Sequence, residues 1–151
     1  MTAYLVYWTP ADIGLCENTP GWSMSCWGSG MSNFSTHWQK GDIIYFSSID
    51  HLDYNSLFGK LVLDQFVSSR EEAEAIIGRP LTSAPFNQYW IGEKPWNQLH
   101  DVDCRELFMT LDFQSGKNLK KDYNGQALQK PRPLTEEDTQ AVEALWLAFT
   151  E

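Results

Sequence analysis

The stretch KGDIIYFSS, residues 40–48, predicts a tight turn followed by a strand. Lys40-Gly41-Asp42 has the composition of a turn, because glycine and a short acidic side chain suit the backbone angles that turns require. Ile43 to Phe46 is a run of β-branched and aromatic residues, which favours a strand. We expect this strand to end at Ser47-Ser48.

Similar apolar runs lie on both sides of this strand. Residues 4–8 (YLVYW) stop at Thr9-Pro10 and predict a strand buried on both faces. Residues 57–66 (LFGKLVLDQF) predict a third strand, with Gly59 as a bulge or a point of close approach. Residues 106–113 (ELFMTLDF) predict a fourth strand.

Two helices have clear start signals. Ser69 and Glu72 form the N-cap and N3 pair of a capping box, and Gly78 predicts the end of that helix. Thr135, with Asp138 at N3, caps a second helix near the end of the sequence. The predicted buried face of this second helix consists of Ala141, Val142, Leu145, Ala148 and Phe149.

The order of these elements predicts an α+β fold. The elements lack the strand–helix alternation of a parallel doubly wound sheet, so we expect a curved, mainly antiparallel sheet or small barrel flanked by short helices. Residues 14–33 and 80–100 have the composition of loops, and residues 34–39 predict a short helix. Because no repeat or linker occurs, residues 1–151 are expected to form a single domain.

The composition is that of a folded, acidic protein. The 151 residues are 42% hydrophobic, and 20 acidic residues outnumber 11 basic ones, which gives a formal charge of -9 at pH 7. A negative field repels phosphate backbones and disfavours strong non-specific binding to nucleic acid. No apolar run approaches the roughly 20 residues of a membrane span, and the first residues lack the basic region of a signal peptide. We therefore expect a cytoplasmic protein.

The usual sequence motifs of metal binding and catalysis are missing. The three cysteines, Cys16, Cys26 and Cys104, form no CxxC pair, and the three histidines have no partner at metal-binding spacing. The sequence also contains no glycine-rich phosphate loop and no GxSxG elbow. We expect no metal, no cofactor and, on balance, no catalytic residue.

Aromatic residues are abundant, with seven Trp, eight Phe and six Tyr. Many of them occur with hydroxyl and amide side chains in the first third of the sequence. This mixture suits a pocket for a flat polar heterocycle, because rings stack on the ligand and polar groups bind its edge. It equally suits a Trp-rich core beneath a polar loop. The residues concerned are Tyr7, Trp8, Trp22, Trp27, Asn33, Tyr45, Phe46, Ser47 and Ser48.

The order of the motifs resembles that of the EVE domains, which belong to the PUA-like superfamily together with the ASCH and YTH modules. Residues 4–12 (YLVYWTPAD) are similar to the opening strand of the family and its acidic exit turn. Residues 27–42, from Trp27 through Asn33 to the Gly-Asp turn, are similar to the Trp-to-Asn segment of the family. The arginines of that segment are absent here, and Ser32 stands where one is expected.

The resemblance continues through the rest of the chain. Residues 43–48 (IIYFSS) resemble the strand that ends in a Tyr-His-Ser signature, although only the two serines remain here. Residues 57–62 (LFGKLV) are similar to the GIVG-type strand that follows, and residues 131–138 (PRPLTEED) to the start of the closing helix. Residues 80–100 match no motif of the family.

The resemblance implies a module that binds a modified base, held flipped in an aromatic pocket. Carried over by position, the ligand-binding residues are Trp8, Trp22, Trp27, Ser29, Asn33, Phe46, Ser47 and Ser48. The partner implied is a modified nucleobase in DNA or RNA, or a free nucleotide. The basic patch of Lys117, Lys120, Lys121 and Lys130 is the expected contact for a nucleic-acid backbone, with an exposed, solvated loop as the alternative.

Two other functions stay open. The first is an enzyme of nucleotide or base modification on the same scaffold, for which Asp12, Asp42 and Glu93 are the candidate acids or bases. The second is a protein-interaction factor of a phage or mobile element, whose acidic surface mimics nucleic acid and binds a basic host protein. The oligomeric state is open as well, because an aromatic surface also suits a dimer contact.

Overall fold

The computed structural model describes residues 1–7, 24–29, 38–51, 54–78, 88–96, 102–119 and 131–150. The strands are β1 (Ala3–Tyr7), β2 (Met24–Ser29), β3 (Ile43–His51), β4 (Tyr54–Val67), β5 (Gln88–Trp96), β6 (Val102–Asp103) and β7 (Arg132–Pro133). The helices are α2 (Arg70–Ile77), α3 (Arg105–Phe108) and α4 (Glu136–Thr150).

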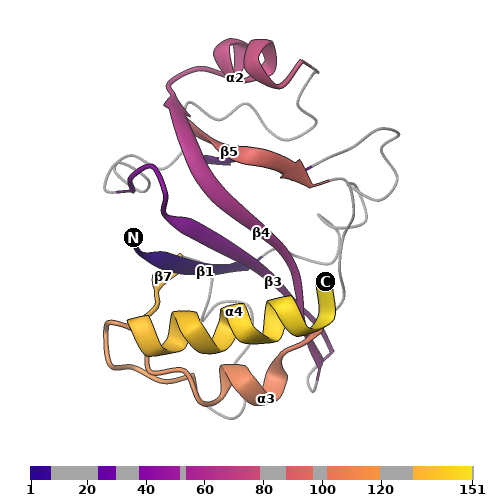
Figure 1. Ribbon diagram of the computed structural model, residues 1–151, viewed down its shortest axis with the longest axis vertical. Helices are drawn as coiled ribbons and strands as arrows, with labels where there is room; N and C mark the ends of the chain where they lie inside the picture. Colours follow the sequence, from indigo (N-terminus) through magenta and orange to yellow (C-terminus); the bar gives the residue numbers. More distant parts are fainter. Residues whose placement is uncertain are drawn as a thin grey trace.

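The strands form one mixed sheet in the order β2-β5-β4-β3-β1-β7, with β6 paired to β4 beside this path. The β1–β3 pair is parallel and the other pairs are antiparallel. The long strand β4 crosses the molecule and connects the lower part of the sheet to the upper part, where β5 and β2 lie (Figure 1). This architecture confirms the predicted α+β class with short flanking helices.

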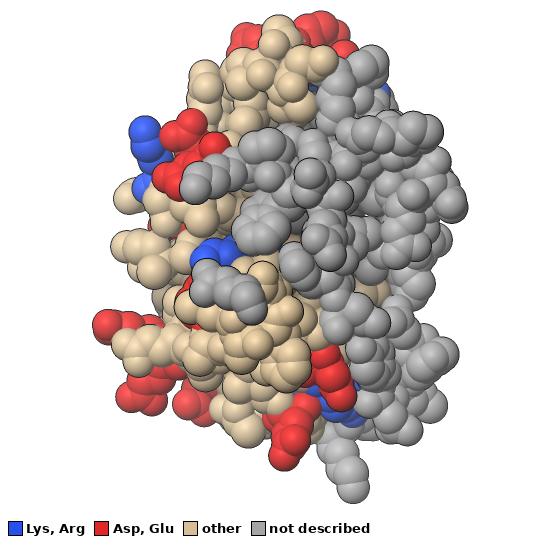
Figure 2. All heavy atoms as spheres, turned by 45° about the vertical axis from the view of Figure 1, so that its right-hand side comes forward, with Lys and Arg blue, Asp and Glu red and all other residues tan. Residues whose placement is uncertain are grey.

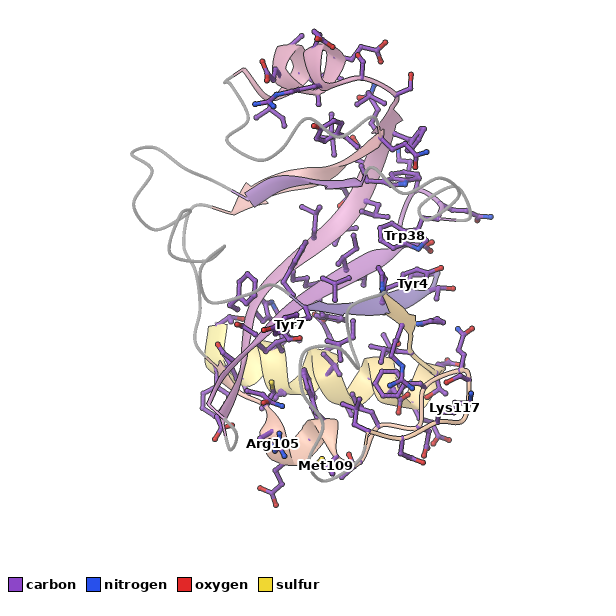
Figure 3. The ribbon with its side chains drawn as sticks, turned by 180° about the vertical axis from the view of Figure 1, so that it is seen from behind. Tyr4, Tyr7, Trp38, Arg105, Met109 and Lys117 are labelled. Carbon is purple, nitrogen blue, oxygen red and sulfur yellow. The ribbon has the colours of Figure 1, made fainter. Side chains whose placement is uncertain are left out.

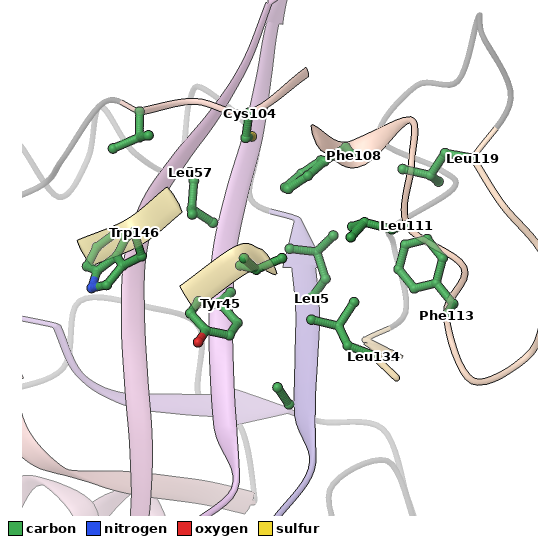
Figure 4. Close-up of a cluster of buried hydrophobic side chains, with 13 residues drawn as sticks. Leu5, Tyr45, Leu57, Cys104, Phe108, Leu111, Phe113, Leu119, Leu134 and Trp146 are labelled. Atoms are coloured by element: carbon green, nitrogen blue, oxygen red, sulfur yellow. The ribbon is translucent and has the colours of Figure 1, made fainter. Parts of the chain in front are cut away.

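Two apolar clusters pack on the opposite faces of the lower sheet. On one face, α3 and α4 cover a cluster that includes Leu5, Tyr45, Leu57, Phe108 and Trp146 (Figure 4). We call this the helix side. The other face, which we call the inner face, is packed with Val6, Trp38, Ile44, Phe46, Phe58, Leu61, Leu63 and Trp90. Successive residues of a strand point to opposite faces, so Tyr45 lies on the helix side and Phe46 on the inner face.

The predicted caps of α2 are confirmed. The Ser69 side chain accepts a hydrogen bond of 3.2 Å from the Glu72 backbone N–H. At the other end, Gly78 adopts the left-handed conformation, with φ of 85°, and its N–H donates to the Glu74 carbonyl. The capping box therefore fixes the start of this short helix and the glycine ends it.

Helix α4 is confirmed, but its predicted buried face is partly wrong. Asp138, Val142 and Trp146, spaced four residues apart, are the buried residues of the helix. This row turns Ala141 and Ala148 outward, and Phe149 in the last turn is 67% exposed. A polar N3 residue and the large Trp146 ring thus define the contact with the sheet.

The predicted strand over residues 106–113 is also wrong. The single turn of α3 begins this segment, and irregular chain follows it. The backbone N–H groups of Asp112 and Phe113 donate to the Asp138 carboxylate, at 3.1 and 2.7 Å. These donors therefore bond to a side chain of α4, where a strand would have used a neighbouring strand.

Strands β2 and β5 lie in segments with the composition of loops. They pair with each other and, through β5, with β4, so contacts distant in sequence produce them. Gly92 permits the close approach of β5 to β4, because a Cβ there would lie 2.2 Å from Cδ1 of the fully buried Leu61. Sequence composition shows the glycine but not this packing role.

A polar network joins α4 to the sheet. The Tyr45 hydroxyl donates to Glu143 Oε2 at 2.5 Å, and Lys60 Nζ lies 2.5 and 2.8 Å from the two carboxylate oxygens of Glu143. Burial, together with the hydrogen bond and charge of Glu143, raises the pKa of Tyr45 above its usual value. Tyr45 therefore remains a protonated donor to α4 at neutral pH.

Acidic side chains dominate the charged surface of the described residues. In Figure 2 the acidic atoms gather at the two ends of the molecule and the basic atoms are scattered. Exposed examples are Glu71 and Glu72 on α2 and Glu136 and Glu137 on α4. Among the described helices, none is long and apolar enough to cross a membrane.

Candidate functional site

The carboxyl end of β1 lies beside the middle of β3, which continues past it to His51. The two strands run parallel, and Tyr7 lies beside Ser47 at the end of the paired stretch. In Figure 3, Tyr7 lies at the opposite end of β1 from Tyr4, which contacts Trp38 with 4.9 Å between the ring centroids. We call the end of β1 and the adjoining part of β3, together with the start of β4, the strand-end region.

Buried polar residues concentrate in the strand-end region. Ser47 and Ser48 come from β3, and Asn55 and Ser56 come from β4. The other buried polar residues among those described are Asp42 and Asp138, whose carboxylates accept backbone hydrogen bonds. The concentration of uncharged polar groups in the strand-end region therefore needs an explanation of its own.

The two serines of β3 differ in their surroundings. The Ser47 hydroxyl donates to the Val6 carbonyl at 2.8 Å, and Ser47 pairs with Leu57 of the helix-side cluster. Ser48 is 0% exposed, and its hydroxyl has no hydrogen-bond partner among the described residues. Because neighbouring residues of a strand alternate, Ser48 lies on the inner face with Phe46. The Ser47 side chain thus links β3 to β1, whereas the Ser48 side chain makes no hydrogen bond to the described residues.

Asn55 has a bonded backbone and an unbonded side chain. Its carbonyl accepts from the Cys104 N–H at 2.9 Å and from Cys104 Sγ at 3.3 Å. Its side-chain Oδ1 and Nδ2 atoms are both buried without a partner. An unpaired buried polar group costs about 1–3 kcal/mol, so such groups are rare without a ligand or functional reason.

A row of polar residues crosses three adjacent strands in the strand-end region. Ser48 pairs with Ser56 across β3 and β4, and Ser56 pairs with Asp103 across β4 and β6. We call these three residues the polar row. Burial falls along it, from fully buried Ser48 through Ser56 to exposed Asp103. Asp103 Oδ1 accepts a hydrogen bond of 3.2 Å from the Arg105 N–H.

Aromatic residues border the strand-end region along the inner face. The rings of Phe46 and Phe58 lie 6.0 Å apart at 45°, and both are buried. Higher on the sheet, Phe66 contacts Trp90 with 5.4 Å between centroids. In the sheet register, Trp90 of β5 lies between Phe66 of β4 on one side and Trp27 of β2 on the other. Phe66 is 39% exposed, so the Phe66–Trp90 pair reaches solvent at Phe66.

Several predicted site residues lie outside the described residues. These are Trp8, Trp22, Asn33, Lys120, Lys121 and Lys130. Trp27 and Ser29 are placed by the backbone of β2 alone. Of the predicted ligand-binding set, the structure thus describes the surroundings of Phe46, Ser47 and Ser48.

Lys117 is exposed, as expected for the basic patch. Its carbonyl accepts a hydrogen bond from Arg132, whose guanidinium stacks over the Phe113 ring at 3.8 Å. Burial lowers the pKa of Arg132. In Figure 3, Lys117 lies on the opposite side of the molecule from Arg105, and hence from the polar row.

The candidate acids and bases have structural or exposed positions. The two carboxylate oxygens of Asp42 accept from the Thr2 and Gln39 N–H groups, each at 2.9 Å, so Asp42 ties the turn to the start of the chain. Glu93 is exposed on β5, and Asp12 lies outside the described residues. Within the described ranges, no group of His, Cys, Asp and Glu side chains has the arrangement of a metal site.

Sequence reasoning missed Asn55, Ser56 and Asp103. The last two become neighbours of Ser48 only through the β3–β4 and β4–β6 registers. The predicted strands before Ser47 and after Ser56 are close enough in sequence to pair as a hairpin. That pairing would have placed Ser56 near Ser48. No local pattern marks Asp103, because β6 is two residues long.

No protein-family model matches the chain, and no curated protein sequence matches it. The chain is similar in structure to the N-terminal domain of Thermococcus gammatolerans McrB bound to m5C DNA. The TM-score is 0.55, the sequence identity is 10%, and the alignment covers 100% of each chain. At this identity the likeness concerns the fold alone, and it agrees with the expected α+β class.

Proposed function

We propose that this protein binds a modified base of a nucleic acid in the strand-end region. The observation that carries the proposal is the buried Ser48 hydroxyl just past the end of β1, which has no hydrogen-bond partner among the described residues. A base edge would supply the missing hydrogen bond, since nucleobases present both donors and acceptors. The similar McrB domain, which is bound to m5C DNA, supports a modified base as the ligand class.

Aromatic residues would supply most of the binding energy. Stacking contributes about 1–3 kcal/mol per base, and flipping a base out of a duplex costs a few kcal/mol. Contacts with two rings therefore offset the cost of flipping. In the proposal these rings come from Trp8, Trp22 and Phe46, and Asn33 and Ser48 complete the site. Trp27 and Ser29 pair with β5 at the level of Phe66, ten residues along β4 from Ser56, and the Ser47 hydroxyl bonds to Val6, so these three predicted residues are not part of it.

The charge of the protein limits the part that phosphate contacts play. At a net charge of -9, general attraction to nucleic acid is weak, so recognition depends mainly on the base. A local contact is proposed for Lys117, Lys120, Lys121 and Lys130. Because Lys117 is remote from the polar row, it would reach phosphates some distance along the strand from the bound base.

Tryptophan fluorescence tests the proposal. Wild-type protein is titrated with short oligonucleotides that contain 5-methylcytosine, 5-hydroxymethylcytosine, N6-methyladenine or no modification. The proposal predicts a saturable change that is strongest for one modified base, and at least about a tenfold loss of affinity in Trp8→Ala, because Trp8 follows Tyr7 at the end of β1. Trp146→Phe is the matched control, because Trp146 packs on the helix side and its replacement leaves affinity unchanged.

Two results would contradict the proposal. In the first, no modified oligonucleotide binds better than the unmodified one. In the second, Trp8→Ala binds like wild type although its circular dichroism spectrum shows a folded protein.

A further inference from the structure

We propose that the polar row selects its base by an exocyclic amino group, with Asp103 as the hydrogen-bond acceptor. This inference rests on the proposed function, because it concerns the ligand of the same region. It assigns a specificity-determining role to Asp103 of β6, which is not one of the site residues predicted from the sequence.

The registers bring the three side chains of the polar row to one face. Ser48 lies directly opposite Ser56, and Ser56 lies directly opposite Asp103, both in antiparallel pairs. Opposed residues of antiparallel strands project to the same side, with Cβ atoms about 4.5–5.5 Å apart. Val102, the neighbour of Asp103, is buried on the helix side, so Asp103 projects away from that cluster.

The burial along the polar row fits a ligand that enters from the surface. Asp103 is exposed, Ser56 is 5% exposed, and Ser48 is 0% exposed with an unpartnered hydroxyl. A flat molecule lying along the row would bond to the buried hydroxyl at one end and to the carboxylate at the other. The unpartnered hydroxyl is the independent sign that a ligand completes the region.

The Asp103 side chain makes the polar row selective for a base that donates a hydrogen bond. One carboxylate oxygen accepts from the Arg105 N–H, and no ion pair involves Asp103 among the described residues. An ionised carboxylate accepts hydrogen bonds and cannot donate them, whereas a serine hydroxyl does both. The two serines therefore tolerate either kind of base edge, and Asp103 requires a donor.

Nucleobases divide according to this requirement. Cytosine presents an amino group at the position where thymine presents a carbonyl oxygen, and a carboxylate accepts from that amino group. A carbonyl at this point would place two acceptors against each other, which opposes binding. The structure thus assigns to the region a base that carries an exocyclic amino group.

Two single-stranded oligonucleotides that differ at one base test the inference. One contains 5-methylcytosine and the other contains thymine, which carries the same methyl group and an oxygen in place of the amino group. Wild type is expected to bind the 5-methylcytosine strand about tenfold more tightly. Asp103→Asn supplies both a donor and an acceptor, so the preference is expected to fall below about threefold.

Asp112→Asn is the matched control. Asp112 is also exposed, and its carboxylate accepts from Asn118 Nδ2 at 3.1 Å. This substitution changes the net charge by the same amount and keeps an acceptor oxygen, so the tenfold preference is expected to remain. Both variants retain an oxygen for their present hydrogen bond, and circular dichroism checks that they fold.

The outcomes separate this inference from the proposed function. If the oligonucleotides bind but wild type shows no preference, or Asp103→Asn keeps the full preference, the amino-group inference is overturned and the base-binding function stands. If neither strand binds to wild type, and no modified oligonucleotide does, both are overturned.

Discussion

The helix side and the strand-end region treat buried polar groups in opposite ways. On the helix side, the Asp138 carboxylate accepts three hydrogen bonds and Glu143 joins Tyr45 to Lys60. In the strand-end region, the Ser48 hydroxyl on the inner face is buried and has no hydrogen-bond partner in the part of the chain that the structure describes. The bonded polar groups on the helix side therefore stabilise the fold, whereas the buried Ser48 hydroxyl makes no hydrogen bond that would stabilise it.

Asp138 is the strongest case on the helix side. Its carboxylate accepts from the backbone N–H groups of Asp112, Phe113 and Thr135, and its own N–H donates to the Thr135 hydroxyl. It thereby fixes the turn in which Phe113 adopts a positive φ of 58°. Asp138→Ala would leave three donors unpaired and is expected to lower the free energy of unfolding by about 3 kcal/mol. Urea denaturation measures this loss, and a loss below about 1 kcal/mol would contradict the account.

The same residue predicts an acid dependence of stability. Burial acts to raise the pKa of Asp138, but the hydrogen bonds from Asp112, Phe113 and Thr135 outweigh it, and the pKa lies below its ordinary value of 3.8. The stability that this carboxylate contributes is therefore present above pH 3.8 and is lost as the pH falls through the depressed pKa. Denaturation between pH 6 and pH 2 should show a shallower acid slope for Asp138→Asn than for wild type. Equal slopes would show that Asp138 is not a source of the acid dependence.

Glu143 carries the next largest effect. Glu143→Ala would leave the buried Tyr45 hydroxyl and the Lys60 ammonium without their acceptor, and we expect a loss of about 2 kcal/mol. Glu137→Ala is the control, because Glu137 is exposed in the first turn of the same helix and contributes a few tenths of a kcal/mol. Thermal and urea unfolding compare the two. Similar losses in the two variants would mean that the network does not anchor α4.

The smallest effects contrast two adjacent serines. Ser47→Ala removes the hydrogen bond to the Val6 carbonyl and is expected to destabilise the protein by about 1 kcal/mol. Ser48→Ala removes a buried hydroxyl that has no partner, so stability is expected to rise by about 1 kcal/mol. Each variant is the control for the other. A loss of stability in both variants would contradict the stated difference between the bonded Ser47 hydroxyl and the unbonded Ser48 hydroxyl.

The parts of the fold that depend on local signals could be predicted from the sequence. Ser69 and Gly78 marked the ends of α2, and the apolar runs before Thr9 and Ser47 marked β1 and the first half of β3. The predicted end of β3 at Ser47-Ser48 was wrong, because pairing with β4 extends the strand to His51. Strands β2 and β5 could not be found in this way, because Gly92 and its neighbours resemble a loop until β4 and β2 pair with them. The prediction of a strand over residues 106–113 was wrong for the converse reason. Its apolar residues suit a strand, but the N–H groups of Asp112 and Phe113 bond to Asp138.

The candidate site was predictable to a similar extent. Ser48 is a site residue predicted from the mixture of aromatic and hydroxyl side chains and from the family resemblance; the structure shows that it is buried, and its role stays a prediction. Ser47 was identified with it, and strand alternation turns its hydroxyl toward a structural bond with Val6. Ser56, Asp103 and Asn55 required the strand registers, which composition does not contain.

The most direct test of the central claim measures stability and binding on the same variant, Ser48→Ala. The account predicts that its free energy of unfolding rises by about 1 kcal/mol while its affinity for the 5-methylcytosine oligonucleotide falls about tenfold relative to wild type. This opposite movement is expected of a group that is kept for a ligand. A Ser48→Ala protein that binds as tightly as wild type, or that loses stability and affinity together, would contradict it.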